Sequence, residues 1–196
     1  MSGERKTAIV TGGSQGIGAG LVKAFLERGY NVVANSRKIT KSGAFETSDE
    51  VALVDGNIAE PATAARIVET ALSRFKSIDA LVNNAGIFFT KPFTDYTTED
   101  FKSLVSTNVE GFLYVTQLSI KQMLAQKTGG SIVTITAALA RNPIRGVTAA
   151  VPMITKGGLE TITQHLAIEY AKDGIRVNAV APARSTPRFP GTLRRT

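Results

Sequence analysis

A glycine-rich turn near the start of the chain has residue types that bind phosphate groups. It reads TGGSQGIG at residues 11–18. Gly12, Gly16 and Gly18 let the backbone approach an anion closely, and the N-terminus of the helix that follows favours negative charge. The turn therefore predicts a nucleotide phosphate site, although a tight strand-to-helix turn without a ligand can have the same residues.

A lysine late in the chain is the second feature with a chemical use. Lys156 follows Pro152 by four residues, so the two share one face of a helix. Proline is tolerated in the first turn of a helix because its missing N–H has no partner there. Its side chain, however, offers no proton. The pair therefore raises the question of whether this helix carries an active site.

Short β-branched runs alternate with helical patterns along the chain, and these elements must position both features. The strand signals cover residues 7–12, 31–36, 51–56, 78–86, 131–136 and 174–182. Helical patterns cover residues 17–28, 61–75, 99–126 and 152–172. Such alternation implies a parallel sheet of about six strands with helices on both faces, and right-handed crossovers make it doubly wound. The expected fold is α/β, with ligands at the carboxyl ends of the strands.

Two of the predicted helices have recognisable start signals. Pro61 stands in the first turn of one helix, where a missing N–H is harmless. Thr97 and Asp100 have the spacing of a capping box before another helix.

Four motifs, in this order along the chain, resemble the short-chain dehydrogenase/reductase family. They are TGGSQGIG at residues 11–18, NNAG at residues 83–86, Asn108 within TNVEGF, and Lys156 within TKGGLETITQHLAIEYAKDGIRVNAVAP. The resemblance runs from about residue 6 to residue 182. It implies a single NAD(P)-binding Rossmann-type domain over residues 1–182. It also implies hydride transfer between a nicotinamide cofactor and a small-molecule alcohol or carbonyl.

The family pattern, carried over by position, implies roles for the motif residues. The glycine-rich turn would bind the pyrophosphate, and Asn84, Ala85 and Gly86 would border the adenine ribose. Lys156 would bind the nicotinamide ribose, and Asn108 would hold a water that links this lysine to solvent. The expected catalytic residues are Asn108 and Lys156, and no metal site is expected. The expected cofactor-binding residues are Gly12, Ser14, Gln15, Gly16, Ile17, Gly18, Arg37, Asn57, Ile58, Asn84, Ala85, Gly86 and Lys156.

The end of the second predicted strand favours NADP(H) over NAD(H). NAD-specific sites place a carboxylate there to accept hydrogen bonds from the ribose hydroxyls, whereas this segment reads NSRK at residues 35–38. Arg37 can pair with a 2′-phosphate, although Arg37 and Lys38 can equally be solvated loop charges. Asn57 stands where many relatives have an aspartate that touches the adenine, and it keeps a hydrogen-bonding side chain.

Two positions depart from the catalytic pattern of the family. A tyrosine that exchanges the substrate proton normally lies one helical turn before the lysine, and that position holds Pro152. A serine that binds the reacting oxygen normally ends the fifth strand. This chain has Ala137 there, and an alignment slip of one residue would bring Thr136 into its place. Losing a general acid costs a factor of about 10² to 10⁴ in rate. Thr148 and Thr155 are the other nearby hydroxyls.

Three hypotheses about function are compatible with these residues. The first is an oxidoreductase with weak or unconventional catalysis, in which Lys156 or a water held by Asn108 donates the proton. The second is a pseudoenzyme that binds the nucleotide without redox turnover. The third is a regulatory or scaffold protein.

The resemblance also has implications for assembly. Relatives commonly form homo-dimers or homo-tetramers through the helices that correspond to residues 99–126 and 152–172. The family pattern has a seventh strand after residue 182 that this sequence does not contain. We therefore expect the sixth strand to lie at an edge of the sheet.

Composition and charge argue against several other function classes. The formal net charge is +7, but residues 183–196 contain four arginines and no acidic residue, and no basic run is interleaved with aromatic residues. We therefore expect a basic tail in coil conformation and no nucleic-acid binding. No apolar run reaches the roughly 18 residues that span a bilayer, so we expect no membrane partner. The absence of cysteine excludes disulfides and fits a cytoplasmic protein.

Overall fold

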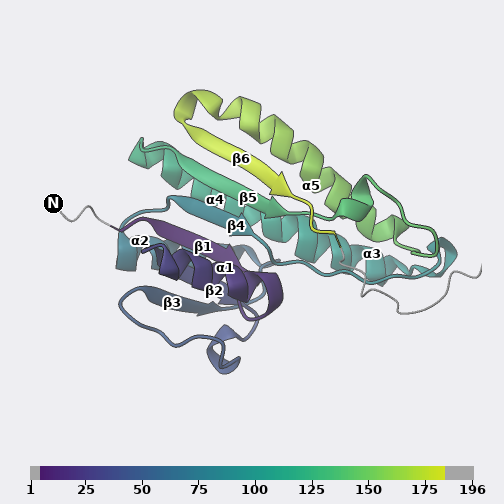
Figure 1. The fold of residues 1–196 in the computed structure, drawn as a ribbon, viewed down its shortest axis with the longest axis horizontal. Helices are drawn as coiled ribbons and strands as arrows, with labels where there is room; N and C mark the ends of the chain where they lie inside the picture. Colours follow the sequence, from purple (N-terminus) through teal and green to yellow (C-terminus); the bar gives the residue numbers. More distant parts are fainter. Residues whose placement is uncertain (1–4, 184–196) are drawn as a thin grey trace, which may run out of the picture.

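One parallel sheet forms the centre of the fold. The computed structural model describes residues 5–183. The strands are β1 (Thr7–Thr11), β2 (Asn31–Ser36), β3 (Val51–Asp55), β4 (Ala80–Asn83), β5 (Gly130–Ile135) and β6 (Ile175–Val180). They pair in parallel in the order β3-β2-β1-β4-β5-β6 (Figure 1). The strand order reverses between β1 and β4, which confirms the expected doubly wound, Rossmann-type α/β fold.

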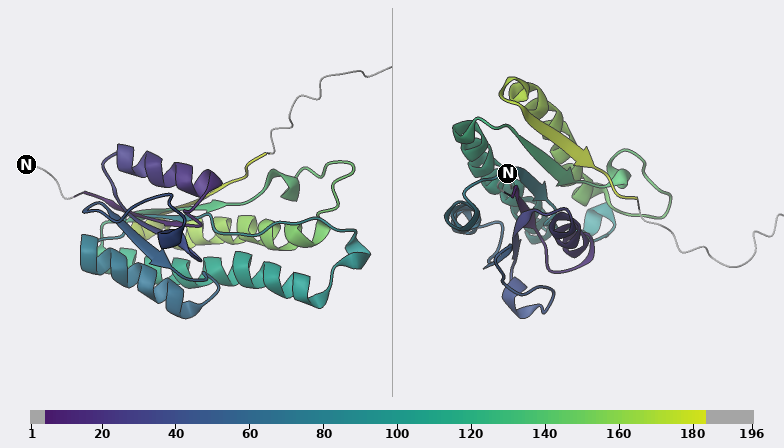
Figure 2. Two further views of the ribbon diagram at one scale, coloured as in Figure 1. Left: turned by 90° about the horizontal axis from the view of Figure 1, so that it is seen from below. Right: turned by 60° about the vertical axis from the view of Figure 1, so that its left-hand side comes forward.

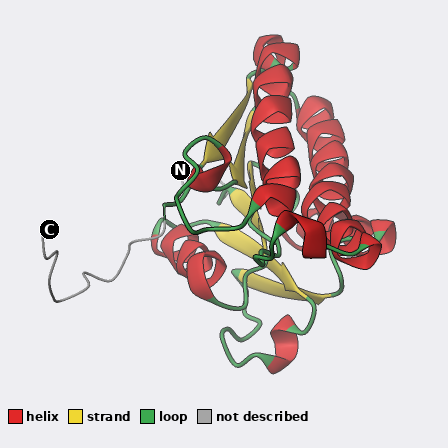
Figure 3. Cartoon of the chain, turned by 90° about the vertical axis from the view of Figure 1, so that its right-hand side faces the viewer, coloured by secondary structure: helices red, strands yellow, loops and turns green. Residues whose placement is uncertain are grey.

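Helices cover the two faces of this sheet unequally. Figure 2 shows α1 (Gly16–Glu27) on one face, and α2 (Pro61–Phe75), α4 (Gly111–Gln126) and α5 (Ala150–Glu169) on the other. The long helices lie together along one side of the strands in Figure 3. Over the edge strand β6, the face on the side of α1 is open, because Arg176, Asn178 and Val180 are exposed while Ile175 and Val177 are buried on the opposite face.

Two apolar clusters hold the helices to the sheet. All five residues of β1 are buried, and alternate side chains of a strand point to opposite faces. Ile9 accordingly joins the larger cluster beneath α2, α4 and α5, and Val10 joins the smaller cluster beneath α1. The central strand is thus fixed from both sides, which places its carboxyl end firmly at one edge of the sheet.

Both predicted helix-start signals are confirmed. Pro61 is the first residue of α2. Before α3 (Thr98–Val105), the Asp100 backbone N–H donates to Thr97 Oγ1 at 3.2 Å, and the Thr97 backbone N–H donates to Asp100 Oδ2 at 2.9 Å. This reciprocal pair is the predicted capping box.

The single helix predicted over residues 99–126 is wrong in one respect. Between α3 and α4 lies a π-helical segment, Ser106–Glu110, that contains the buried Asn108. Hydrophobic periodicity identifies the residues as helical. It does not distinguish the hydrogen bonds of a π-helix, between residues five apart, from those of an α-helix, between residues four apart. Short 3₁₀ turns occupy Ile39–Lys41, Phe93–Asp95, Ala138–Ala140 and Ala171–Asp173.

The last predicted helix begins two residues earlier than expected. α5 starts at Ala150, so Pro152 is its third residue and lies within the first turn, where its missing N–H leaves no hydrogen bond unmade. The predicted coil at residues 183–196 lies outside the described residues, except for Ala183. Within residues 5–183, no helix is long and apolar enough to cross a membrane.

Candidate active site

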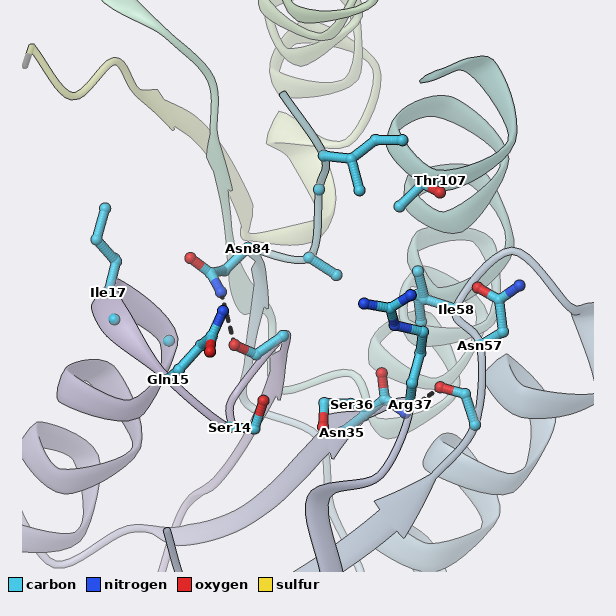
Figure 4. A pocket seen from close by; sticks show the side chains of 17 residues that line it. Ser14, Gln15, Ile17, Asn35, Ser36, Arg37, Asn57, Ile58, Asn84 and Thr107 are labelled. Carbon is cyan, nitrogen blue, oxygen red and sulfur yellow. Dashed lines mark hydrogen bonds between the residues drawn. The ribbon is translucent and has the colours of Figure 1, made fainter. Parts of the chain in front are cut away.

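A cavity of about 430 Å³ opens at the carboxyl ends of the strands, where the strand order reverses. Every expected cofactor-binding residue except Lys156 lies in its lining. The lining consists of Gly12, Ser14, Gln15, Gly16, Ile17, Gly18, Asn35, Ser36, Arg37, Gly56, Asn57, Ile58, Asn84, Ala85, Gly86, Ile87 and Thr107 (Figure 4). A doubly wound sheet binds its ligands at this point.

The backbone of the glycine-rich turn forms one wall of the cavity. Gly12 and Gly16 have φ values of 66° and 55°, in the left-handed region that other residues rarely adopt. A Cβ at Gly18 would collide with the Gly12 carbonyl oxygen and lie 2.6 Å from Asn84 Nδ2. Gln15 precedes α1 and makes no side-chain cap. The first N–H groups of α1 therefore have no capping side chain, as an anion site requires.

Hydrogen bonds join this turn to the turn after β4. Asn84 Nδ2 donates to the Thr11 carbonyl at 2.9 Å and to the Gly12 carbonyl at 3.1 Å. Thr11 Oγ1 accepts from the backbone N–H groups of Asn84 and Ala85 at 3.1 and 3.0 Å. The carboxyl ends of β1 and β4 are thereby held at a fixed separation.

The opposite wall is formed by the ends of β2 and β3. The buried Asn35 donates through Nδ2 to the carbonyls of Val54 and Gly56 at 2.9 and 3.2 Å, which fixes the spacing of these two strand ends. The exposed Arg37 follows β2 and points toward the cavity in Figure 4. No aspartate or glutamate is among the described residues that line the cavity, so its only formal charge is positive.

Lys156 and Asn108 meet at one end of this cavity. A Cβ at Gly86 would lie 3.1 Å from both Asn108 Oδ1 and Lys156 Nζ. Lys156 is 8% exposed, and its Nζ donates to the Ile135 carbonyl at 2.9 Å. Burial lowers the pKa of the Lys156 ammonium below its ordinary value of 10.5. The lysine therefore comes within reach of the cavity through the glycine of the NNAG motif.

The amide of Asn108 has all its hydrogen bonds within the protein. Its Oδ1 accepts from the Ile87 backbone N–H at 2.8 Å, and its Nδ2 donates to the Ile87 carbonyl at 3.1 Å and to Thr155 Oγ1 at 3.0 Å. Thr155 Oγ1 in turn donates to the Pro152 carbonyl at 2.8 Å. Asn108 thus joins the turn after β4 to Thr155 on α5.

The hydroxyl of Thr136 has a structural role at the end of β5. Thr136 Oγ1 donates to Glu160 Oε1 at 3.1 Å, and Arg141 Nε donates to Glu160 Oε2 at 2.6 Å. Among the hydroxyls near the lysine, those of Thr136 and Thr155 are therefore committed to protein partners. Ala137 and the buried Pro152 contribute no proton-transferring side chain.

Some lining residues carry little sequence signal. Asn35, Ser36 and Gly56 end their strands and could have been expected from their position alone. Ile87 and Thr107 have no motif of their own, and Thr107 reaches the cavity from the π-helical segment. Among the described residues, no group of three or more histidine, cysteine or acidic side chains could hold a metal ion.

Comparison with known proteins agrees with this architecture. Residues 6–191 match the family model described as short chain dehydrogenase. An uncharacterized oxidoreductase of Methylorubrum extorquens is 34% identical over 186 residues, which cover 91% of this chain and 73% of the relative.

Two solved structures with bound cofactors have the same fold. The 3-ketoacyl-(acyl-carrier-protein) reductase from Brucella melitensis, complexed with NADH, has a TM-score of 0.86 at 33% identity and covers 92% of this chain and 76% of its own. A variant of ElxO with NADPH bound has a TM-score of 0.83 at 28% identity and covers 91% and 73%. From the family model, the sequence relatives and the shared fold, we conclude that this chain belongs to the short-chain dehydrogenase/reductase family.

Proposed function

We propose that this protein is an NADP(H)-preferring oxidoreductase that transfers hydride between the nicotinamide and a small-molecule carbonyl or alcohol. The observation that carries the proposal is the cavity at the strand ends, whose lining is continuous from the glycine-rich turn to Gly86 and the neighbouring Lys156. Structural neighbours with the same fold hold NADH and NADPH. A dinucleotide therefore suits both the fold and the residues that line the site.

The proposed cofactor contacts follow the lining. The pyrophosphate would lie against Gly12 and the N-terminus of α1, where unpaired N–H groups favour an anion. Asn57 and Ile58 would border the adenine, and Lys156 would bind the nicotinamide ribose. Asn108 would act as a positioning residue, because its amide ties the Ile87 backbone to α5.

Arg37 supports the preference for NADP(H). It lies at the end of β2, where the adenine ribose is bound in doubly wound folds. No acidic side chain lines the described cavity and would repel a 2′-phosphate. A guanidinium forms strong charge-assisted hydrogen bonds with phosphate.

Carbonyl reduction also needs a proton, whose source in this proposal is Lys156 or a water held by Asn108. A bound NADPH would supply hydride to the carbonyl carbon, and the carbonyl oxygen would need a proton from the protein or from water. Ala137 and Pro152 have none to give, and both amide N–H donors of Asn108 are bound within the protein. We assign the donor role to the Lys156 ammonium, because burial lowers its pKa and a lower pKa makes it a better general acid near neutral pH.

The test combines nucleotide binding with turnover. NADPH fluorescence should show saturable binding, and a panel of carbonyl substrates should reveal NADPH oxidation that is slow by enzyme standards. Lys156→Ala should abolish this turnover, whereas Lys172→Ala, at an exposed position, should not change it. Binding without turnover above the uncatalysed rate would contradict the redox function. Absence of NADPH and NADH binding would contradict the whole proposal.

A further inference from the structure

A second cavity, much smaller than the first, lies beside Lys156 within the interior. Its volume is about 10 Å³, which is close to the smallest volume that can hold one water molecule. Its polar lining side chains are Thr11, Asn83, Asn108, Thr134 and Lys156, and the rest of its lining is apolar or glycine. The cavity is therefore polar enough to hold water and too small for anything else.

Two of these side chains have polar atoms without a protein partner. They are Asn83 Oδ1 and Thr134 Oγ1, on residues that are 6% and 1% exposed. Asn83 and Thr134 are register partners on β4 and β5, so their side chains project side by side from the same face of the sheet. Buried polar atoms in folded proteins almost always bind a partner, either protein or ordered water.

The remaining polar groups can be assigned one by one. Thr11 Oγ1 donates to the Val82 carbonyl at 3.3 Å and accepts the two bonds described above. The Asn108 amide makes the three bonds to Ile87 and Thr155. Lys156 Nζ uses one of its three N–H donors on the Ile135 carbonyl. Asn83 and Thr134, each with an unpartnered polar atom, and Lys156, with two donors left, thus line the same small cavity.

We infer that this cavity binds a single structural water that accepts a hydrogen bond from Lys156 Nζ, donates one to Asn83 Oδ1, and forms a third with Thr134 Oγ1. Three hydrogen bonds are the usual number for a buried water. Asn83 Nδ2 already donates to Thr116 Oγ1 at 2.9 Å, which leaves its Oδ1 for the water. If the amide were turned by 180°, one polar atom of Asn83 would still be left for the cavity.

This water gives Asn83 and Thr134 a role as positioning residues for the ammonium. An acceptor behind Nζ stabilises the charged lysine against the cost of burial, and it holds Nζ in place beside Gly86. No carboxylate lines this cavity in the described part of the chain. Glu160, one turn further along α5, is bound to Thr136 and Arg141. In the small cavity, the water is then the main group that solvates the Lys156 ammonium.

The binding of the water does not depend on redox turnover, whereas its value for proton donation rests on the proposed function. The test therefore uses the full chain without cofactor. A crystal structure at high resolution should show one water within about 3.2 Å of Asn83 Oδ1, Thr134 Oγ1 and Lys156 Nζ. A dry cavity, or a water that contacts neither Asn83 nor Thr134, overturns the inference even if the enzyme turns over NADPH.

Variants add a measurement in solution. Thr134→Val replaces the hydroxyl with a methyl group and should expel the water, lowering the pKa of Lys156, followed by NMR of its side chain, by about one unit. Thr134→Ser keeps the hydroxyl and should leave that pKa unchanged. Ser119→Ala is the matched control, because Ser119 Oγ is also buried without a partner but does not line the cavity. An unchanged pKa in folded Thr134→Val would refute the role of the water. If that variant does not fold, the crystal structure decides.

Discussion

The two ends of the cavity at the carboxyl edge of the sheet differ in which atoms form them. One end is made mainly of backbone, and the other depends on side chains. The nucleotide end, around the glycine-rich turn, is formed mainly by backbone, with Gly12 and Gly16 at positive φ and Gly18 against the neighbouring turn. The proposed catalytic end, around Lys156, depends on side-chain groups, and there the chain has Ala137 and Pro152. A site made of backbone is tied to the fold, so it persists as long as the turn folds. A proton donor is a single side chain, which can be exchanged without a change of fold.

The structure shows why the catalytic end tolerates those residues. Pro152 lies in the first turn of α5, where proline costs no hydrogen bond. Its carbonyl still accepts from Thr155, which keeps Asn108 in place. The framework around Lys156 is therefore retained without the hydroxyl that the family pattern has one turn before it.

The largest expected effect comes from restoring side chains at the catalytic end. Pro152→Tyr combined with Ala137→Ser supplies a phenol one turn before Lys156 and a hydroxyl at the end of β5. Turnover with NADPH should rise by a factor of about 10² to 10⁴, the usual contribution of a general acid. Pro152→Phe with Ala137→Ser is the control for ring size. Equal rates in the two double variants would show that the missing hydroxyl does not limit the reaction.

The next prediction compares a glycine of the backbone-built nucleotide end with a glycine in the helix that follows it. Gly18→Ala should destabilise the protein by about 1–3 kcal/mol and remove nucleotide binding, because the new Cβ meets the Gly12 carbonyl and Asn84. Gly20→Ala, in the same helix with open space around it, should stabilise by about 0.5–1 kcal/mol. Thermal unfolding and NADPH titration measure both. Similar changes in the two variants would mean that tight contact at Gly18 is unimportant.

A smaller effect concerns which cofactor the nucleotide end prefers. Arg37→Ala should weaken NADPH binding about tenfold, since one charge-assisted bond to phosphate contributes roughly 1.5 kcal/mol. NADH binding should stay unchanged, because NADH lacks the 2′-phosphate. Lys38→Ala is the control for general loss of positive charge. Tighter binding of NADH than of NADPH by the unmutated protein would rule out the proposed preference.

The smallest effect is the pH dependence of stability due to Lys156. Its pKa is lower in the folded protein than the ordinary 10.5, so between these two values the unfolded chain binds more protons. The free energy of unfolding should therefore rise with pH in that window and be independent of this group below it. Lys156→Met should lack this rise, as denaturant titrations at several pH values would show. A rise of the same size in the variant would assign it to other groups.

The sequence predicts the backbone-built end better than the catalytic end, for a physical reason. The glycine-rich turn, Pro61 and the capping box at Thr97 depend on neighbouring residues, and local patterns identify them. The bonds of Asn108 to Ile87 and Thr155 join segments that are 21 and 47 residues apart. Likewise, Asn83 and Thr134 meet only through the register of β4 and β5. Such contacts are set by tertiary packing and leave no periodic signal.

The π-helical segment gives the helix pair α3–α4 one residue more than uninterrupted α-geometry needs. An inserted residue in an α-helix rotates everything after it by about 100°, but a widened turn absorbs the extra residue locally. Thr107 and Asn108, which reach the large and the small cavity, both lie within this turn. A change of length here would alter what lines the cavities while α4 kept its phase against the sheet. A change in the π-helical segment can therefore alter the lining of the two cavities without altering how α4 packs on the sheet.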